Sequence, residues 1–269
     1  MAYVVLFGEP LRGLVNDWWN DPEAGHGLLL APLAVWLVWR TGLRKEPARP
    51  QPLLGAALLV SSVALRYVAG LAAEVFTMRA AAFGALLGLI VWIWGFRQVL
   101  SWWLPLILLA LAIPLPSLIT TALAFPLQLK ASAMGAALLE LRNVPVRLNG
   151  NIIQLPGQSL FVTEACSGLR SLTALISLGV LIGGLWLRQP WSRILLVLLA
   201  IPVAILINAV RVFLTGFLVF FVSQKMGEGF MHVTEGWLMF LVAFGMLGLI
   251  AFALDAAEKR LARRSAAHA

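Results

Sequence analysis

Cysteine, histidine and charged residues are all scarce in this sequence. Its 269 residues include a single cysteine, Cys166, and three histidines, His26, His232 and His268. One cysteine excludes an intramolecular disulfide and any metal site built from several cysteines, and we expect neither a metal nor a cofactor. Only 12% of the residues are charged, whereas soluble domains have about 25%. The composition therefore excludes an ordinary soluble domain.

Long apolar stretches take the place of the missing charge, and 61% of the residues are hydrophobic. A helix needs about 20 apolar residues to cross a bilayer core of about 30 Å, whereas a membrane β-barrel would show short alternating segments. We therefore predict an all-α polytopic membrane protein with about seven transmembrane helices. The predicted spans are 27–40, 52–71, 78–97, 99–116, 168–188, 191–211 and 233–254.

The net charge of +8 indicates membrane orientation, and we expect no nucleic-acid partner. Basic residues gather in 40–50 and in the tail 255–269, which the positive-inside rule places in the cytoplasm. Counting spans then puts Arg97 and the turn 188–193 inside as well, and the segments around Glu74, 117–165 and 223–232 outside. We expect one integral membrane domain over 1–269, with 117–165 as an extracytoplasmic insertion and 255–269 as a cytoplasmic basic tail.

The first 23 residues carry no secretory signal pattern, because no basic segment leads into a long apolar core. Residues 1–8 are too short to span a membrane, and 9–23 carry four acidic residues against one basic residue, which suits an outside location. Either this segment inserts without a signal, or a further helix precedes residue 1.

The segment 117–165 is expected to hold the structure that lies outside the bilayer. Residues 117–141 mix apolar and polar side chains and predict an amphipathic helix at the membrane interface. The Asn149-Gly150 pair between apolar residues predicts a β-hairpin, and Pro156-Gly157 precedes another strand-like run at 159–162. This small β element leads directly to Cys166.

Cys166 and Arg211 are the first two candidate functional residues. If a helix begins at Thr163, the Cys166 thiol lies in its first turn, where the helix dipole favours the thiolate. The alternative is that Cys166 is a small buried hydrophobic residue.

Arg211 interrupts an apolar run and shares a helix face with Asn208. A guanidinium in the membrane costs about 2.5–3.5 kcal/mol, so it either has a partner or cavity or extends to the headgroups.

His232 begins the last predicted span, on the side where Cys166 and Arg211 are expected. It is either an interfacial residue without a role or a general base and acid for the thiol. A thiolate can attack a carbonyl while a guanidinium or backbone N–H stabilises the oxyanion, so the three residues form an acyl-transfer set. We expect the sulfur within about 3–6 Å of an imidazole nitrogen, in a wet cavity open to the outside. We expect Arg170 to contact substrate, as do Glu164 and Asn208, or to take the cation role. The alternative is that Arg170 forms a structural ion pair, for example with Glu164 or Glu235.

Three strings carry a resemblance to a known family: Glu-Ala-Cys-Ser-Gly-Leu-Arg at 164–170, Asn-x-x-Arg at 208–211 and His-x-x-x-Gly at 232–236. They resemble, in order and spacing, the signature blocks of the exosortase/archaeosortase family of membrane cysteine transpeptidases. His26-Gly27 and Val144-Pro145-Val146 match as well, and the resemblance covers about 18–250. Gly25, preceded by Ala24, departs from the Tyr-Ser of many members, and the first helix of the family is not evident.

The resemblance implies that Cys166 is the nucleophile and that Arg211 and His232 are catalytic. It further implies substrates that are membrane-anchored secreted proteins with a C-terminal sorting signal, made of a short motif, a transmembrane helix and a basic tail. Cleavage would pass through a thioester acyl-enzyme at the outer face of the cell inner membrane. The substrate motif, cut site, acyl acceptor and oligomeric state are not predicted.

Two other functions compete with this one. A transporter or channel subunit would use Arg211 and Asn208 to line a polar path, which requires broken or repeated helices around a midplane site. A catalytically inactive scaffold would bind sorting-signal helices without turnover. An Arg211 at the bilayer centre, far from Cys166, would favour the transporter.

Overall fold

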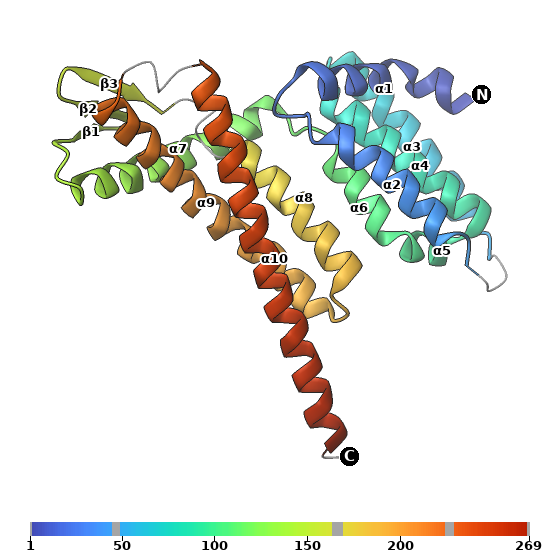
Figure 1. The fold of residues 1–269 in the computed structure, drawn as a ribbon. Coiled ribbons are helices and arrows are strands. Elements are labelled where there is room, and N and C mark those ends of the chain that lie inside the picture. Colours follow the sequence, from blue (N-terminus) through green and yellow to red (C-terminus); the bar gives the residue numbers. More distant parts are fainter. Residues whose placement is uncertain (1, 45–48, 163–168, 224–228, 268–269) are drawn as a thin grey trace. The chain divides into compact units, whose positions relative to one another are not determined.

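The computed structural model describes residues 2–44, 49–162, 169–223 and 229–267, except for the side chains of 229–236 and 265–267. Helices and strands follow one another in this order (Figure 1): α1 (Ala2–Asn20), α2 (Gly27–Thr41), α3 (Pro52–Leu71), α4 (Val75–Trp94), α5 (Phe96–Ser101), α6 (Trp103–Leu111), α7 (Ser117–Glu140), β1 (Arg147–Asn149), β2 (Ile152–Leu155), β3 (Gln158–Phe161), α8 (Leu169–Trp186), α9 (Pro190–Phe221) and α10 (Gly229–Ala267). The chain divides into two compact units, unit 1 over Met1–Pro116 and unit 2 over Ser117–Ala269.

Most of the chain consists of helices long and apolar enough to cross a membrane. Among the described residues, six have this length and composition: α3, α4, α7, α8, α9 and the part of α10 from Trp237 to Arg264. The shorter α2 is also apolar. The prediction of an all-α polytopic membrane protein is confirmed, and the expected spans 27–40, 52–71 and 168–188 coincide closely with α2, α3 and α8.

The expected span 99–116 is wrong, because the chain forms two short helices there, α5 and α6, that meet at Trp102. Pro105 favours the break. Proline has no N–H to donate and suits the first turn of a helix best, although Pro126 and Pro202 lie inside α7 and α9. A helix that begins anew at Trp103 places Pro105 in its first turn, and Pro114 and Pro116 follow soon after its end.

Glycines allow α3 and α4 of unit 1 to pack closely as an antiparallel pair. A Cβ atom at Gly55 would lie 2.7 Å from the Trp92 Cα, and one at Gly88 would lie 3.1 Å from the Leu59 backbone nitrogen. No larger residue fits at Gly55 without moving backbone. Helices in lipid associate through such close contacts, since lipid tails are as apolar as their side chains.

Helix α1, which the sequence analysis did not predict, packs on α4. Phe7 is buried against Ala81, Ala82 and Ala85, and the Tyr3 hydroxyl donates a hydrogen bond of 2.8 Å to the Ala82 carbonyl. These contacts hold a segment whose acidic residues were expected outside the membrane.

An ion pair in unit 1 joins Asp17 of α1 to Arg79 of α4. The two side chains approach to 2.7 Å, and that of Arg79 is only 7% exposed. Gly13 leaves room for the guanidinium, since a Cβ atom there would lie 3.4 Å from an Arg79 Nη. The other ion pair between α1 and its neighbours, Glu9 with Arg66, is longer at 3.7 Å, and Glu9 is 84% exposed.

One end of unit 1 gathers the basic turns. The Gly42 carbonyl, after α2, accepts hydrogen bonds from Gln98 Nε2 and Trp102 Nε1, and Gln98 Oε1 accepts one from the Arg44 backbone N–H. Gly95 has φ +84° and leaves no room for a Cβ atom beside the Arg49 carbonyl. Gly42, Arg44 and Arg49 therefore lie beside the turn that precedes Arg97, at one end of unit 1.

In unit 2 the predicted hairpin is confirmed as part of a three-stranded antiparallel sheet in the order β1-β2-β3. Gly150 follows β1 with φ +62°, and Gly157 lies between β2 and β3 with φ +79°. Glycine adopts these left-handed conformations without steric cost. The sheet packs on the C-terminal end of α9 (Figure 1), where Gln158 Nε2 donates a 3.0 Å hydrogen bond to the Val219 carbonyl.

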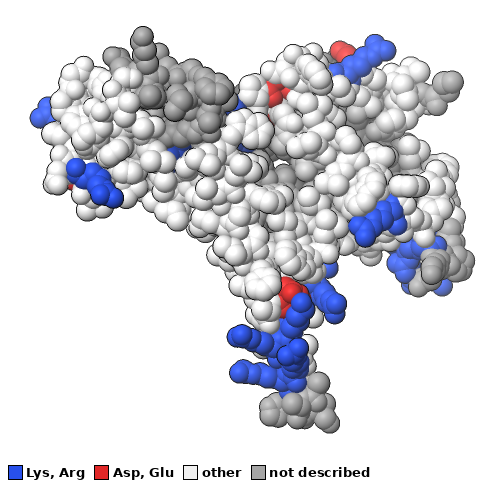
Figure 2. Space-filling model, viewed as in Figure 1, with Lys and Arg blue, Asp and Glu red and all other residues white. Residues whose placement is uncertain are grey.

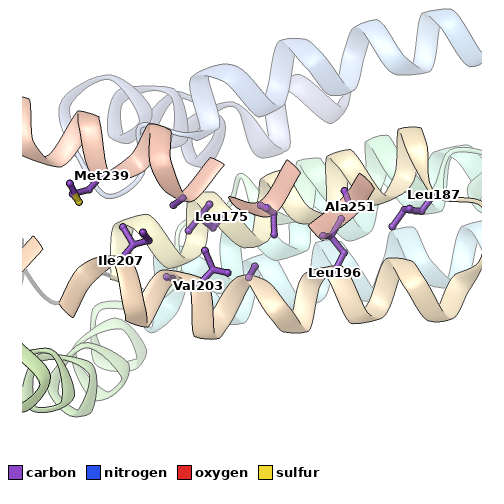
Figure 3. Close-up of a cluster of buried hydrophobic side chains, with 11 residues drawn as sticks. Leu175, Leu187, Leu196, Val203, Ile207, Met239 and Ala251 are labelled. Carbon is purple, nitrogen blue, oxygen red and sulfur yellow. The ribbon is translucent and has the colours of Figure 1, made fainter. Parts of the chain in front are cut away.

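Helices α8, α9 and α10 form the main core of unit 2. Its buried apolar side chains line the seam between the three helices and include Leu175, Leu196, Ile207, Met239 and Leu247 (Figure 3). Within the described residues nothing lies within 4 Å of a Cβ atom built at Gly245 or Gly248. These two glycines therefore mediate no close helix contact among the described residues.

At the opposite end of unit 2 from the sheet, Glu258 of α10 binds the turn between α8 and α9. Its carboxylate accepts hydrogen bonds from the backbone N–H groups of Arg188 and Gln189 and from the Ser192 hydroxyl. Basic side chains gather around the end of α10 (Figure 2), namely Lys259, Arg260, Arg263 and Arg264. The expected basic tail is thus helical, and it lies at the same end as the basic turn 188–193.

The Asp17–Arg79 pair gives a first test. We expect Asp17→Ala to lower the stability of the purified protein by roughly 1–3 kcal/mol, because it leaves a nearly buried guanidinium without its carboxylate. Glu9→Ala, in contrast, removes a partner from an exposed pair worth about 0–1 kcal/mol. Thermal unfolding in detergent measures both variants, and equal losses for the two would contradict the role of the buried pair.

Candidate active site

Helix α9 carries two of the predicted site residues, Asn208 and Arg211. Asn208 is 5% exposed and Arg211 is half-buried. Thr215, 4% exposed, lies one turn further along, and its hydroxyl donates a 3.0 Å hydrogen bond to the Arg211 carbonyl. These spacings place Asn208 and Thr215 on one face of α9, with Arg211 beside them. A helix that is otherwise strongly apolar thus has a polar stretch.

Arg211 lies far along α9 from the basic end of unit 2. It comes 18 residues after Arg193, which corresponds to about 27 Å at 1.5 Å per residue. The apolar layer of a bilayer is about 30 Å thick. If Arg193 marks one border of that layer, Arg211 lies close to the other border.

The packing of α8 against α9 places the start of α8 beside this polar stretch. A Cβ atom at Gly183 would lie 3.5 Å from the Arg193 Cα, and one at Gly179 would lie 3.6 Å from the Val197 Cα. The two helices are therefore antiparallel with a constant register. If the same pairing continues along both helices, Leu169, the first residue of α8, lies opposite Ile207 of α9. Leu169 is then about one helical turn from Arg211.

Cys166 and Glu164 precede Leu169 and lie outside the described residues. The residues on both sides of 163–168 are well anchored. Val162 exchanges hydrogen bonds with Asn151, its N–H with the Asn151 carbonyl at 3.0 Å and its carbonyl with Asn151 Nδ2 at 3.1 Å. Val162 and Leu169 are 2% and 4% exposed. The sheet and α8 thus hold both ends of the segment that contains the cysteine.

His232 lies in the first turn of α10, and its side chain is outside the described part of the structure. Met239, two turns later in α10, shows how far along unit 2 the His232 backbone lies. Met239 and Ile207 of α9 are at the same end of the core cluster (Figure 3). Because α10 is antiparallel to α9, the His232 backbone lies about one turn beyond Arg211, on the side of the sheet.

Arg170 is exposed in the first turn of α8, where its carbonyl accepts a 3.0 Å hydrogen bond from the Thr173 hydroxyl. The side chains of Glu164 and Glu235, its alternative ion-pair partners, lie outside the described residues.

His26, in unit 1, places Nδ1 and Nε2 each 3.1 Å from a backbone carbonyl, of Glu23 and Leu111 respectively. These contacts join the turn before α2 to the end of α6, so His26 is explained by structure.

Helix α7 is present as predicted, but two of its polar residues, Gln128 and Ser132, do not face the membrane interface. Gln128 and Ser132 are 6% and 0% exposed. They share one face with Ala131, Gly135 and Leu139, the face that packs on α9. Both residues belong to the segment predicted as an amphipathic interface helix. Their spacing from the small residues Ala131 and Gly135 is the signal in the sequence for a packed face.

The search for metal-binding groups found no cluster of three or more histidine, cysteine or acidic residues in the described part of the chain. Among the described residues, this end of unit 2 offers the Arg211 guanidinium, the amides of Gln128 and Asn208 and the hydroxyls of Ser132 and Thr215.

Comparison with known proteins decides the family. The sequence profile of the transmembrane exosortases matches residues 18–249. The chain belongs to the transmembrane exosortase family. Neither the search of curated proteins nor the search of solved structures found a match. The family and the apolar helices together make this exosortase a multi-pass membrane protein with a function related to protein sorting.

The crossing of α7 and α9 beside Arg211 is open to a direct test. A Cβ atom at Gly135 would lie 2.5 Å from Val212 Cγ1, so we expect Gly135→Ala to destabilise the exosortase by about 1–3 kcal/mol through overpacking. Gly245→Ala is the matched control, since its Cβ atom meets nothing within 4 Å and alanine favours helix over glycine. Thermal unfolding in detergent should show a loss for the first variant alone, and a loss of equal size in both would contradict the tight crossing.

Proposed function

We propose that this exosortase is an integral-membrane cysteine endopeptidase and transpeptidase that cleaves C-terminal sorting signals at the outer face of the membrane. Cys166 is the nucleophile, His232 the general base and acid, and Arg211 the cation that stabilises the oxyanion. Glu164, Arg170 and Asn208 contact the substrate. The supporting observation is that the start of α8, the polar stretch of α9 and the start of α10 lie at one end of unit 2, opposite its basic end.

The covalent chain supports this assignment of Cys166. Three residues of chain span at most about 11 Å, so Cys166 lies within this distance of Leu169, which is level with Ile207 of α9. Arg211 is one turn further along α9, and the backbone of His232, in the first turn of α10, lies about one turn beyond. A distance of about 3–6 Å between Cys166 Sγ and an imidazole nitrogen remains our prediction.

The chemistry needs only these groups. His232 takes the proton from Cys166 Sγ, and the thiolate attacks the carbonyl carbon of the scissile peptide bond. The tetrahedral oxyanion is stabilised by the Arg211 guanidinium or by backbone N–H groups. The carbon–nitrogen bond then breaks, the leaving amine takes the proton from His232, and a thioester remains on Cys166. An acceptor nucleophile attacks this thioester, gives up its proton to His232 and releases the thiolate.

The substrates in this proposal are membrane-anchored secreted proteins that carry a short motif, a transmembrane helix and a basic tail. A nucleophile near the outer end of the helices meets such a peptide where it leaves the bilayer. The basic ends of units 1 and 2 each fit a cytoplasmic location, which agrees with a cell inner membrane and an active site on the other side.

A transporter or channel subunit is the second candidate, and it has less support. That function requires polar residues and broken helices near the middle of the membrane. If Arg193 marks one border of the apolar layer, Arg211 lies close to the other border, about 27 Å further along α9 by helix rise. Residues Pro190–Phe221 form one helix, with Pro202 inside it.

The test is co-expression with candidate signal-bearing proteins, followed by mass measurement of the mature C-terminus. We expect Cys166→Ala and Cys166→Ser to lower processing by at least about 10³-fold, as removal of a nucleophile does in other hydrolases, while both variants accumulate in membranes. His232→Ala should do the same, and His268→Ala, in the tail, serves as the matched histidine control. Processing retained by Cys166→Ala would refute the mechanism.

A further inference from the structure

The last turns of α10 carry three arginines on one face. Arg260, Arg263 and Arg264 are spaced three and four residues apart, which places their side chains next to one another on a helix. All three are exposed, and they belong to the basic end of α10 in Figure 2. Among the described residues none of the three has an ion-pair partner. We call this surface the arginine face of α10.

The acidic residues closest to this face in the chain do not neutralise it. Asp255 and Glu258 are only 7% and 8% exposed. The Asp255 carboxylate pairs with Lys259 at 2.5 Å, and the Glu258 carboxylate accepts hydrogen bonds from the turn between α8 and α9. Within the described part of α10, the charge that faces outward after Glu258 is therefore positive.

The helix is formed here against the repulsion of its own charges. Arg260 lies three residues before Arg263 and four before Arg264, and like charges at these spacings destabilise a helix. The residues from Lys259 to Arg264 are all exposed, so packing does not compensate for the repulsion. The helix dipole favours cations near a C-terminus and offsets part of it. An anion bound between the guanidinium groups removes the remainder.

Two tryptophans mark the level of the membrane interface at this end of unit 2. Trp186 is the last residue of α8 and Trp191 the second of α9, and they are 49% and 43% exposed. Tryptophan is enriched where a membrane meets water. Because Glu258 binds the turn between these two residues, Lys259 begins the part of α10 that enters the headgroup layer.

The arginine face stays within reach of the headgroups. Arg260 and Arg264 come two and six residues after Glu258, which corresponds to about 3 and 9 Å along the helix. The headgroup region extends about 5–7 Å beyond the apolar layer, and charges act over about 8 Å more at physiological salt. Even if α10 runs straight away from the membrane, the three guanidinium groups lie within the range of its surface charge.

We propose that the arginine face of α10, formed by Arg260, Arg263 and Arg264, is a binding site for the phosphate headgroups of anionic phospholipids. A guanidinium binds phosphate through two parallel hydrogen bonds. The bilayer is the source of the anions because the face begins at the membrane interface of a multi-pass protein. This assignment needs only the membrane location and does not rest on the proposed function. Bound headgroups hold the part of α10 that extends beyond its contacts with α8 and α9.

The test measures how fast trypsin cleaves α10 after Lys259 and Arg263 in the full-length protein in nanodiscs. The discs contain phosphatidylcholine alone or a mixture with phosphatidylglycerol. Each basic residue near an anionic surface contributes a factor of about five in binding. We therefore expect phosphatidylglycerol to slow cleavage of the unaltered protein by at least about tenfold at low salt, and high salt to remove this protection.

The double variant Arg260→Gln/Arg264→Gln removes two of the three guanidinium groups and keeps both cleavage sites. We expect its cleavage rates in the two kinds of disc to be nearly equal. Its melting temperature in detergent should match that of the unaltered protein, because the exposed side chains of Arg260 and Arg264 have no partner among the described residues.

The double variant Arg142→Gln/Arg147→Gln is the matched control, since it removes two exposed arginines at the sheet end of unit 2 and should keep the full protection. Equal cleavage of the unaltered protein in both kinds of disc would overturn the proposal, as would protection that persists in Arg260→Gln/Arg264→Gln. Equal protection by glycerol phosphate or polyglutamate in phosphatidylcholine discs would also overturn it, because the ligand would then be a soluble anion or an acidic protein segment.

Discussion

The contact between Glu258 and the turn before α9 sets the arrangement of unit 2. In lipid, apolar side chains such as Leu196 and Leu247 pack without a hydrophobic driving force, and they hold helices together without strongly fixing how far one slides along another. The Glu258 carboxylate binds two backbone N–H groups and the Ser192 hydroxyl, which fixes α10 at one point. Because helices are rigid, this point also determines where α10 begins, at the level of the polar stretch of α9.

Unit 1 uses polar contacts in the same way. Gln98 and Trp102 bind the Gly42 carbonyl at the basic end, and Arg79 pairs with Asp17 of α1. In a chain that is 61% hydrophobic, apolar side chains determine that helices form and associate. The few buried polar groups determine which residues face one another, since each costs free energy unless it is paired.

The sequence predicted most of the helices and the hairpin, because apolar length and the Asn149-Gly150 turn are local signals. It missed the break at Trp102, where the apolar run continues and the position of Pro105 favours a new helix. It missed α1, whose contacts with Ala82 and Arg79 are distant in sequence. It placed Arg211 and Asn208 on one helix face. It did not predict the burial of Gln128, because this burial depends on the packing of α7 on α9. Cys166, Glu164 and the His232 side chain lie outside the described residues, and their roles stay predictions.

The central claim is that the single thiol lies at the outer end of unit 2, opposite the basic end. Labelling with a membrane-impermeant maleimide tests it on the unaltered protein, because Cys166 is the only cysteine in the chain. The account predicts labelling from outside in intact cells or right-side-out vesicles, and none in sealed inverted vesicles until detergent is added. Labelling from the cytoplasmic side alone would contradict the account.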